Sequence, residues 1–128
     1  MRHFILPRDK VIYAYVAGGP PGSALTDLFS FYYLPSQVLQ HEVHKILHVA
    51  YSFYNVSTTG RLKEGMHELL LRAKSEVDAD VFNALNVMEN ASFLEELKFG
   101  VGDGALHYYL YNWRIKDVKP SDLGIVLV

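Results

Sequence analysis

The sequence predicts an α/β fold, with a mixed sheet in a single domain over residues 1–128. Several segments rich in aromatic and β-branched residues have the length and alternation of strands. One segment, Leu62–Val77, instead carries apolar residues at helical spacing. The predicted order is strand, strand, strand, helix, strand, helix, strand, strand, which is typical of a mixed α/β layer.

Composition excludes several classes of protein. The chain has no cysteine, so disulfides, thiolate metal sites and a cysteine nucleophile are excluded. Its formal net charge is −2 with both signs interspersed, which provides no basic surface for nucleic acid. No apolar run approaches the roughly 18 residues that a membrane helix needs. We therefore expect a cytoplasmic protein with no membrane span and no nucleic-acid partner.

Three strands are predicted in the first half of the chain. Lys10–Ala17 and Leu25–Leu34 are rich in strand-forming residues, and the glycine- and proline-rich run Gly18–Gly22 between them predicts a turn. The second strand is apolar on both alternating faces, which predicts that it is covered on both sides. Pro35 ends this strand, and a third, aromatic strand is expected over His48–Val56.

The amphipathic helix over Leu62–Val77 is the clearest element of the sequence. Charged residues occupy the face opposite its apolar stripe, as in a helix packed on one side against a core. Thr58 or Thr59 is the expected N-cap. The apolar stripe consists of Leu62, Met66, Leu69, Leu70, Ala73 and Val77.

The second half of the chain has weaker patterns. Asp80–Met88 has the length of a strand and the composition of a helix, and we favour a strand. Asn90 is the predicted N-cap of a short helix over Ala91–Leu97, which Gly100 would end. The last two strands are expected over Ala105–Ile115 and over the apolar terminus Leu123–Val128.

The loop GVGDG, residues 100–104, has two interpretations. Closely spaced glycines can direct backbone N–H groups at a phosphate, but phosphate loops run from a strand into a helix, whereas this loop is predicted to run from a helix into a strand. Asp103 would also place a negative charge in such a loop. Two alternatives remain: a tight turn that needs positive φ, or close approach of the backbone to a ligand, with Asp103 facing a cation.

Three further features contain candidate site residues. In HEVHKILH, the spacing of His41, His44 and His48 permits a helical metal site, but the motif is one residue short of HExxH, so a polar connection is the favoured interpretation. Ser36 lacks the G-x-S-x-G context of a nucleophile and is better suited to capping or to hydrogen bonding a ligand. The abundant tyrosines are consistent with core packing, although several buried hydroxyls can also line an apolar cleft with polar groups.

Several strings in order along the chain resemble one family, the eukaryotic glycylpeptide N-myristoyltransferases, over their C-terminal portion. The most specific is KFGVGDG, which matches a signature of that family. The other strings that carry the resemblance are LPS (34–36), AYSFYNV (50–56), DVFNAL (80–85), MEN (88–90) and YYLYNW (108–113).

The resemblance implies transfer of a tetradecanoyl group from myristoyl-CoA to the amine of an N-terminal glycine, on a fold of two halves similar to GNAT acyltransferases. This chain would be the second half, and Asp103 matches an acid that meets a lysine of the substrate peptide. The resemblance also implies that the free carboxylate of the last residue, Val128, is the catalytic base. The peptide-binding residues implied by motif position are Ser36, Tyr51, Asn83, Leu85, Asp103, Gly104, Leu106 and Leu127.

The second signature of the family, a string of the type EINFLCxHK, is absent, and with it the segment that resembles the acyl-CoA site. We therefore expect the chain to bind no cofactor itself, and myristoyl-CoA to be a co-substrate held by a missing N-terminal half. The expected partners are that half and a glycine-initiated peptide, and the chain alone is expected to be inactive.

Two other functions remain open. A stand-alone module can use a tyrosine-lined groove to bind peptides without chemistry. A small acyltransferase of the GNAT type is less favoured, because no strand-to-helix loop in the sequence is suited to a CoA pyrophosphate.

Overall fold

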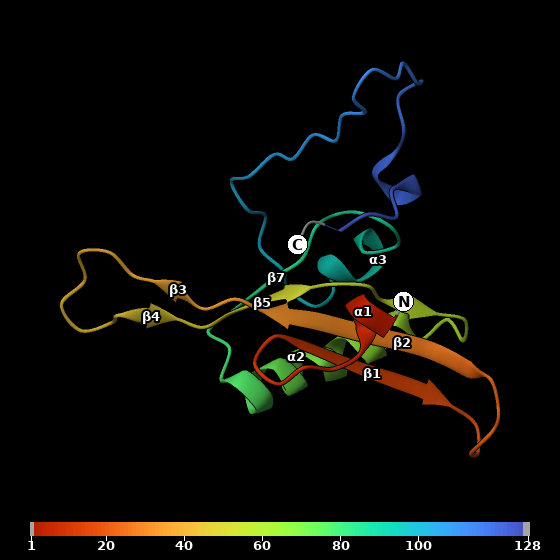
Figure 1. Cartoon of the computed structure of the whole chain (residues 1–128), viewed down its shortest axis with the longest axis horizontal. Helices are drawn as coiled ribbons and strands as arrows, with labels where there is room; N and C mark the ends of the chain where they lie inside the picture. The colour runs from red at the N-terminus through yellow and green to blue at the C-terminus, as the bar shows by residue number, and fades with distance from the viewer. Residues whose placement is uncertain (1, 127–128) are drawn as a thin grey trace. The chain divides into compact units, whose positions relative to one another are not determined.

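A computed structural model describes residues 2–126, and their contacts form two compact units. Unit 1 ends at Leu85, and unit 2 begins at Asn86 (Figure 1). The interpretation of residues 1–128 as one domain stays a prediction.

A mixed sheet is the centre of unit 1. Its strands follow the order β1 (Ile12–Gly18), β2 (Leu25–Tyr33), β5 (Val49–Ser52) and β7 (Val81–Asn83), and β6 (Val56–Ser57) also pairs with β2. β5 and β7 are parallel, while the other pairs are antiparallel. The predicted mixed sheet is therefore confirmed, although β5 and β6 divide the single strand that was expected over His48–Val56.

β2 is buried on both faces, as its sequence predicts. Phe29 and Phe31 lie on one face and Ser30 on the other, and all three are buried. Phe31 is fully buried and stacks on Tyr13 of β1, with ring centroids 4.9 Å apart. Aromatic stacking across neighbouring strands thus fixes the β1–β2 pair.

The helix α2 (Leu62–Val77) has the predicted bounds and buries the predicted face through Leu62, Met66, Leu69 and Ala73. It contacts β2 and lies in sequence between the parallel strands β5 and β7, so these elements form a β-α-β crossover (Figure 1).

The predicted threonine cap of α2 is wrong. Arg61 holds the N-cap position without a capping side-chain bond, because the Thr59 hydroxyl donates to Asp27 at 2.8 Å instead. At the other end, Asp78 adopts the left-handed conformation (φ 49°), and its N–H donates to the carbonyl of Ala73.

A small hairpin follows β2, formed by β3 (Ser36–Gln37) and β4 (Ile46–Leu47). His41 and His44 lie in its connecting loop, where His41 Nδ1 accepts the His44 backbone N–H at 3.0 Å. This loop is not helical, so the helical metal site considered from the sequence does not form. Over residues 2–126, no group of three or more potential ligand side chains is placed to hold a metal ion.

Unit 2 contains only two short helices in its described part, α3 (Ala91–Leu94) and the 3₁₀ turn η1 (Pro120–Asp122). Asn90 holds the predicted N-cap position of α3, but its backbone is helical (φ −60°, ψ −31°) and its side chain makes no cap bond. The helix ends at Leu94, three residues before the predicted end at Leu97, and turn residues follow it up to Lys98, whose φ is 63°.

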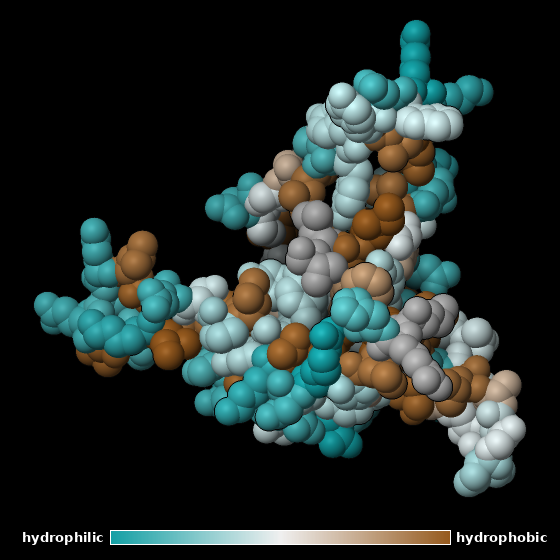
Figure 2. All heavy atoms as spheres, viewed as in Figure 1, coloured by the Kyte–Doolittle hydropathy of each residue, from teal (hydrophilic) through white to brown (hydrophobic). Residues whose placement is uncertain are grey.

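The strands predicted over Ala105–Ile115 and from Leu123 onward are not formed in the described residues. A strand needs a hydrogen-bonding neighbour, and every ladder of the described chain lies in unit 1. Most side chains of this region are exposed, although Val126 is buried, and Figure 2 shows apolar and hydrophilic atoms side by side on the surface of the molecule. The exposed apolar and aromatic residues of unit 2 include Val101, Tyr109, Tyr111 and Trp113.

The helices of the described residues are too short or too polar to cross a membrane.

Candidate functional site

A row of polar-tipped side chains crosses three strands of the unit 1 sheet. Tyr32 of β2 is registered opposite Tyr51 of β5, and Tyr51 is registered opposite Asn83 of β7. Residues in register on neighbouring strands project from the same face, so the sheet brings Tyr51 and Asn83 together as neighbours. Both are among the peptide-binding residues that the family resemblance implies.

The two tyrosines of this row are stacked, with ring centroids 4.9 Å apart and an interplanar angle of 6°. Burial raises the pKa of Tyr32, and the neighbouring Tyr51 hydroxyl raises it further. The Tyr32 phenol therefore stays protonated at neutral pH and can act as a hydrogen-bond donor. Tyr32 was not predicted as a site residue, although its alternation with Phe31 and Tyr33 already placed it on the opposite face from Phe31.

The other predicted residues of unit 1 flank this row in sequence. Leu85 lies two residues beyond the end of β7 and is half-buried. Ser36 is exposed in β3, where it pairs with Leu47 of β4. It therefore belongs to the separate two-stranded sheet, and its register does not place it in the row.

Asp103, Gly104 and Leu106 are exposed residues of unit 2. They lie in a segment without helix or strand, which leaves their backbone accessible. The tight-turn interpretation of the glycines is wrong, because the glycines with positive φ in the described chain are Gly22 and Gly60. A Cβ added at Gly104 would meet no atom within 4 Å.

One hydrogen bond joins the aromatic segment of unit 2 to the C-terminal segment. The Tyr108 hydroxyl donates to the backbone carbonyl of Ile125 at 3.0 Å, and Val126 is buried. The two segments are thus in contact at Tyr108 and Ile125, without strand pairing. Leu127 and Val128 lie outside the described residues, so their assignments stay predictions.

A cluster of polar side chains at the start of β5 was not predicted. The Tyr33 hydroxyl and His48 Nδ1 lie 2.5 Å apart, and the His48 backbone N–H donates to the Asp80 carboxylate at 2.9 Å. These bonds link the ends of β2 and β7 across β5. They hold the strands that carry Tyr51 and Asn83 in register.

A second unpredicted network surrounds Asp27, which is buried. Its carboxylate accepts hydrogen bonds from Ser57, from Thr26 at 2.6 Å and from Thr59 at 2.8 Å. The Ser57 and Thr26 hydroxyls, followed by Thr59 and the Arg61 charge, lower the pKa of Asp27 to about 2 against the opposing effect of burial. The carboxylate stays ionised at neutral pH and fixes the entry to α2.

Comparison with solved structures first defines the class of fold. An acetyltransferase from Trypanosoma brucei matches 79% of this chain and 70% of its own length with a TM-score of 0.60, at 13% identity, which shows a shared fold alone. A ribosomal-protein-alanine N-acetyltransferase from Brucella melitensis likewise matches with a TM-score of 0.53 at 17% identity. The chain therefore shares its fold with these acetyltransferases, as the predicted GNAT-like α/β fold implies.

Within this fold class, a sequence profile identifies one family. The profile described as myristoyl-CoA:protein N-myristoyltransferase, C-terminal domain, matches residues 1–126, and the chain belongs to this family. The Saccharomyces cerevisiae N-myristoyltransferase with bound myristoyl-CoA matches 80% of this chain and 28% of its own length, with a TM-score of 0.73 and 32% identity.

Curated relatives agree with this family. The chain is 50% identical over 127 residues to glycylpeptide N-tetradecanoyltransferase 2 of Danio rerio and 48% identical over 129 residues to glycylpeptide N-tetradecanoyltransferase 1 of Arabidopsis thaliana. These alignments cover 99% and 100% of this chain but 25% and 30% of the relatives. The chain thus spans less than a third of the length of these relatives.

Proposed function

We propose that this chain supplies the peptide-binding surface and the catalytic base of an N-myristoyltransferase, which transfers a tetradecanoyl group from myristoyl-CoA to the amine of an N-terminal glycine. The observation that carries this proposal is the family match over residues 1–126. The adjacency of Tyr51 and Asn83 in the β5–β7 register supports it, because two predicted peptide contacts become neighbours.

The residues proposed to bind the peptide are of three chemical kinds: polar, apolar and acidic. Tyr51, Asn83 and Ser36 offer hydroxyl and amide groups, which can pair with the N–H and C=O groups of an extended peptide. Leu85, Leu106 and Leu127 offer apolar contacts. The exposed Asp103 carboxylate, beside the unobstructed backbone of Gly104, is suited to a lysine ammonium of the substrate.

The catalytic base is proposed to be the Val128 carboxylate, which requires Val128 to be the last residue of the natural protein. An α-carboxyl titrates about 4 units below an α-amine, so this proton transfer costs roughly 5–6 kcal/mol in water. Burial disfavours both charged groups, and a well-positioned amine reacts with an advantage equivalent to roughly 7–11 kcal/mol. Both effects reduce the cost.

In the proposed reaction, the ammonium of the glycine transfers a proton to the carboxylate, and the neutral amine attacks the thioester carbonyl carbon. The C–N bond forms, the C–S bond breaks, and CoA leaves as its thiolate, which takes up the second proton of the amine and is released as the thiol. No covalent enzyme intermediate is required, in agreement with the absence of cysteine.

Myristoyl-CoA is proposed as a co-substrate held by a preceding N-terminal half, as suggested by the yeast relative that contains it. This N-terminal half is also a proposed partner, and the cytoplasm is the proposed location. No metal or resident cofactor is part of the proposal.

A chimera tests the proposal: residues 1–128 replace the C-terminal domain of the yeast relative, and thiol release from myristoyl-CoA is measured with a glycine-initiated, lysine-containing peptide. We expect turnover, and we expect D103N to raise KM for that peptide roughly tenfold by loss of a charged pair. The same peptide with glutamine in place of lysine is the control, and D103N should change its KM little. A folded chimera without turnover would contradict the proposed function.

The base is tested separately in the same chimera. Extending Val128 by one glycine moves the carboxylate, and we expect kcat to fall by at least about 100-fold. V128L keeps the main-chain carboxylate and should retain most activity. If the extended chimera is as active as the original, the terminal carboxylate is not the base.

The isolated chain distinguishes the half-enzyme from a stand-alone binding module. We expect no turnover and, by calorimetry, only weak binding of the glycine-initiated peptide without myristoyl-CoA. Tight binding by the isolated chain would favour the non-catalytic module, and turnover by it would show that no further half is required.

A further inference from the structure

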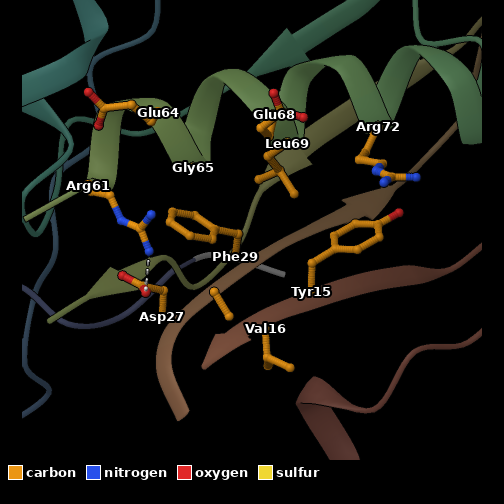
Figure 3. A pocket seen from close by; sticks show the side chains of 11 residues that line it. Tyr15, Val16, Asp27, Phe29, Arg61, Glu64, Gly65, Glu68, Leu69 and Arg72 are labelled. Carbon is orange, nitrogen blue, oxygen red and sulfur yellow. Dashed lines mark ion pairs between the residues drawn. The ribbon is translucent and has the colours of Figure 1, made fainter. Parts of the chain in front are cut away.

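Unit 1 contains a pocket that none of the proposed peptide-binding residues line. It lies between one face of α2 and the β1–β2 pair, and its volume is about 420 Å³ (Figure 3). This is within the range of roughly 300–1,000 Å³ that is usual for small-molecule sites. Because the pocket lies wholly within unit 1, its shape is set by contacts of that unit alone.

The apolar wall of the pocket is rigid. Phe29 and Leu69 are buried side chains that also line the pocket, so packing behind them fixes their positions. A Cβ added at Gly65 would lie 1.9 Å from Cζ of Phe29, which means that the phenyl ring lies directly against the helix backbone. Ala17 of β1, which is in register with Asp27 on the same face as Phe29, completes this apolar wall.

Two arginines line the pocket, and they differ in their partners (Figure 3). Arg61 Nη2 lies 3.9 Å from the Asp27 carboxylate, and its Nε donates to the Thr59 hydroxyl at 3.3 Å. Arg72 lies over the ring of Tyr15, with its guanidinium carbon 5.7 Å from the ring centroid. Over residues 2–126, no carboxylate forms an ion pair with Arg72.

Tyr15 adds a second donor beside Arg72. Figure 3 shows its hydroxyl directed toward the Arg72 guanidinium at one end of the pocket. Burial, followed by the charge of Glu76, raises the pKa of Tyr15, so its hydroxyl stays protonated at neutral pH. A planar guanidinium and a phenol O–H together are suited to a carboxylate.

We propose that this pocket binds a small monocarboxylate with an apolar body. The carboxylate accepts hydrogen bonds from Arg72 and Tyr15, and the body packs against Phe29, Leu69 and Ala17. Glu64 and Glu68 also line the pocket and would repel a second carboxylate, so a monocarboxylate is favoured over a dicarboxylate. The proposal is independent of the proposed function, because it shares no residue with the peptide site.

Three probes with the same body test the class of ligand: 3-phenylpropionate, 3-phenylpropan-1-ol and 3-phenylpropylamine. Each is titrated into the ¹⁵N-labelled 128-residue chain, and amide shifts are followed by NMR. We expect the carboxylate to bind with a Kd on the order of 0.1–1 mM, as usual for a ligand of this size. The alcohol should bind at least about tenfold more weakly. The shifted amides should belong to β1 and to the α2 residues that line the pocket.

Two variants test the geometry. R72M keeps the side-chain stem but removes the guanidinium, and should weaken the carboxylate at least about tenfold while leaving the alcohol unchanged. A17L fills the pocket from β1 and should weaken both probes. R114M, which removes an exposed arginine of unit 2, is the matched control and should change neither Kd. Circular dichroism and thermal unfolding confirm that each variant is folded.

Three outcomes would overturn the proposal. The first is binding of the amine as tightly as the carboxylate, which would assign the pocket to cations through Glu64 and Glu68. The second is an unchanged carboxylate Kd in folded R72M. The third is an absence of shifts around the pocket at a carboxylate concentration of about 10 mM. None of these results bears on turnover by the chimera.

Discussion

Units 1 and 2 contain similar aromatic segments with opposite structural outcomes. In unit 1, β2 is paired on both sides, and its Phe31 is 0% exposed. In unit 2, the segment around Tyr109 and Tyr111 forms no ladder, and these side chains are 87% and 88% exposed. Alternating aromatic residues therefore favour a strand, but a strand forms only where another strand supplies hydrogen bonds and a packing surface.

Truncation of a buried side chain in each unit gives the largest expected contrast. F31A removes a fully buried ring that contacts Tyr13 and Phe82, and should lower the free energy of unfolding by about 3–5 kcal/mol. L110A in unit 2 removes a side chain that is 56% exposed and should change the free energy of unfolding by less than about 0.5 kcal/mol. Urea unfolding followed by circular dichroism measures both. A large effect of L110A would show that unit 2 contributes to the same cooperative core.

Glycines test the same contrast through backbone packing. G65A introduces a Cβ 1.9 Å from the Phe29 ring, and displacement of that ring should cost about 1–3 kcal/mol of stability despite the better helix propensity of alanine. G102A adds a methyl group with no atom within 4 Å and should be close to neutral. Thermal and urea unfolding of the two variants distinguish them. Equal stability of G65A and the original chain would contradict the close contact of α2 with Phe29.

The sequence predicted the elements whose signal is local. The bounds of α2 were correct because the helical period depends only on residues within a few turns, and β1 and β2 were found because both have strong strand composition. The threonine cap predicted for α2 was wrong for a long-range reason. Thr59 donates to Asp27, 32 residues away, and no local rule identifies that partner.

The candidate site shows the same division between local and long-range signals. Short strings identified Tyr51 and Asn83 through family resemblance, and the register then made them neighbours. Tyr33, His48 and Asp80 come from three separated segments, and only the sheet topology brings them together. The pocket beside Arg72 could not be predicted because its shape depends on how Gly65 lets α2 approach Phe29.

The Asp27 network makes the stability of unit 1 depend on acidic pH. Its folded pKa of about 2 lies below the ordinary value of 3.8, so its stabilising effect is present above the ordinary value and is lost as pH falls from about 4 to 2. D27N removes the ionisable carboxylate. The free energy of unfolding of this variant should therefore be lower than that of the original chain at pH 7, and it should change less between about pH 4 and pH 2. Urea unfolding at pH 7, 4 and 3 measures the change.

Asp78 is the matched control for this titration. Its pKa is also lowered, first by the hydrogen bond from Lys74, but both side chains are exposed, so solvent screens the pair. Asparagine tolerates the left-handed backbone at this position. D78N should therefore change stability and its pH dependence less than D27N. The reverse order would show that the buried Asp27 network does not anchor the entry to α2.

The smallest expected effect concerns the hydrogen bond from Tyr108 to the Ile125 carbonyl in unit 2. Y108F removes an exposed bond and should change the free energy of global unfolding by less than about 0.5 kcal/mol. Because this bond links the aromatic segment to the C-terminal segment, its loss should increase amide hydrogen exchange near Val126 while leaving β2 and α2 unchanged. Y109F, which alters a side chain 87% exposed, is the control and should leave exchange unchanged. A loss of more than about 1 kcal/mol in Y108F would mean that the C-terminal segment unfolds together with the sheet of unit 1, and that the two units share one cooperative transition.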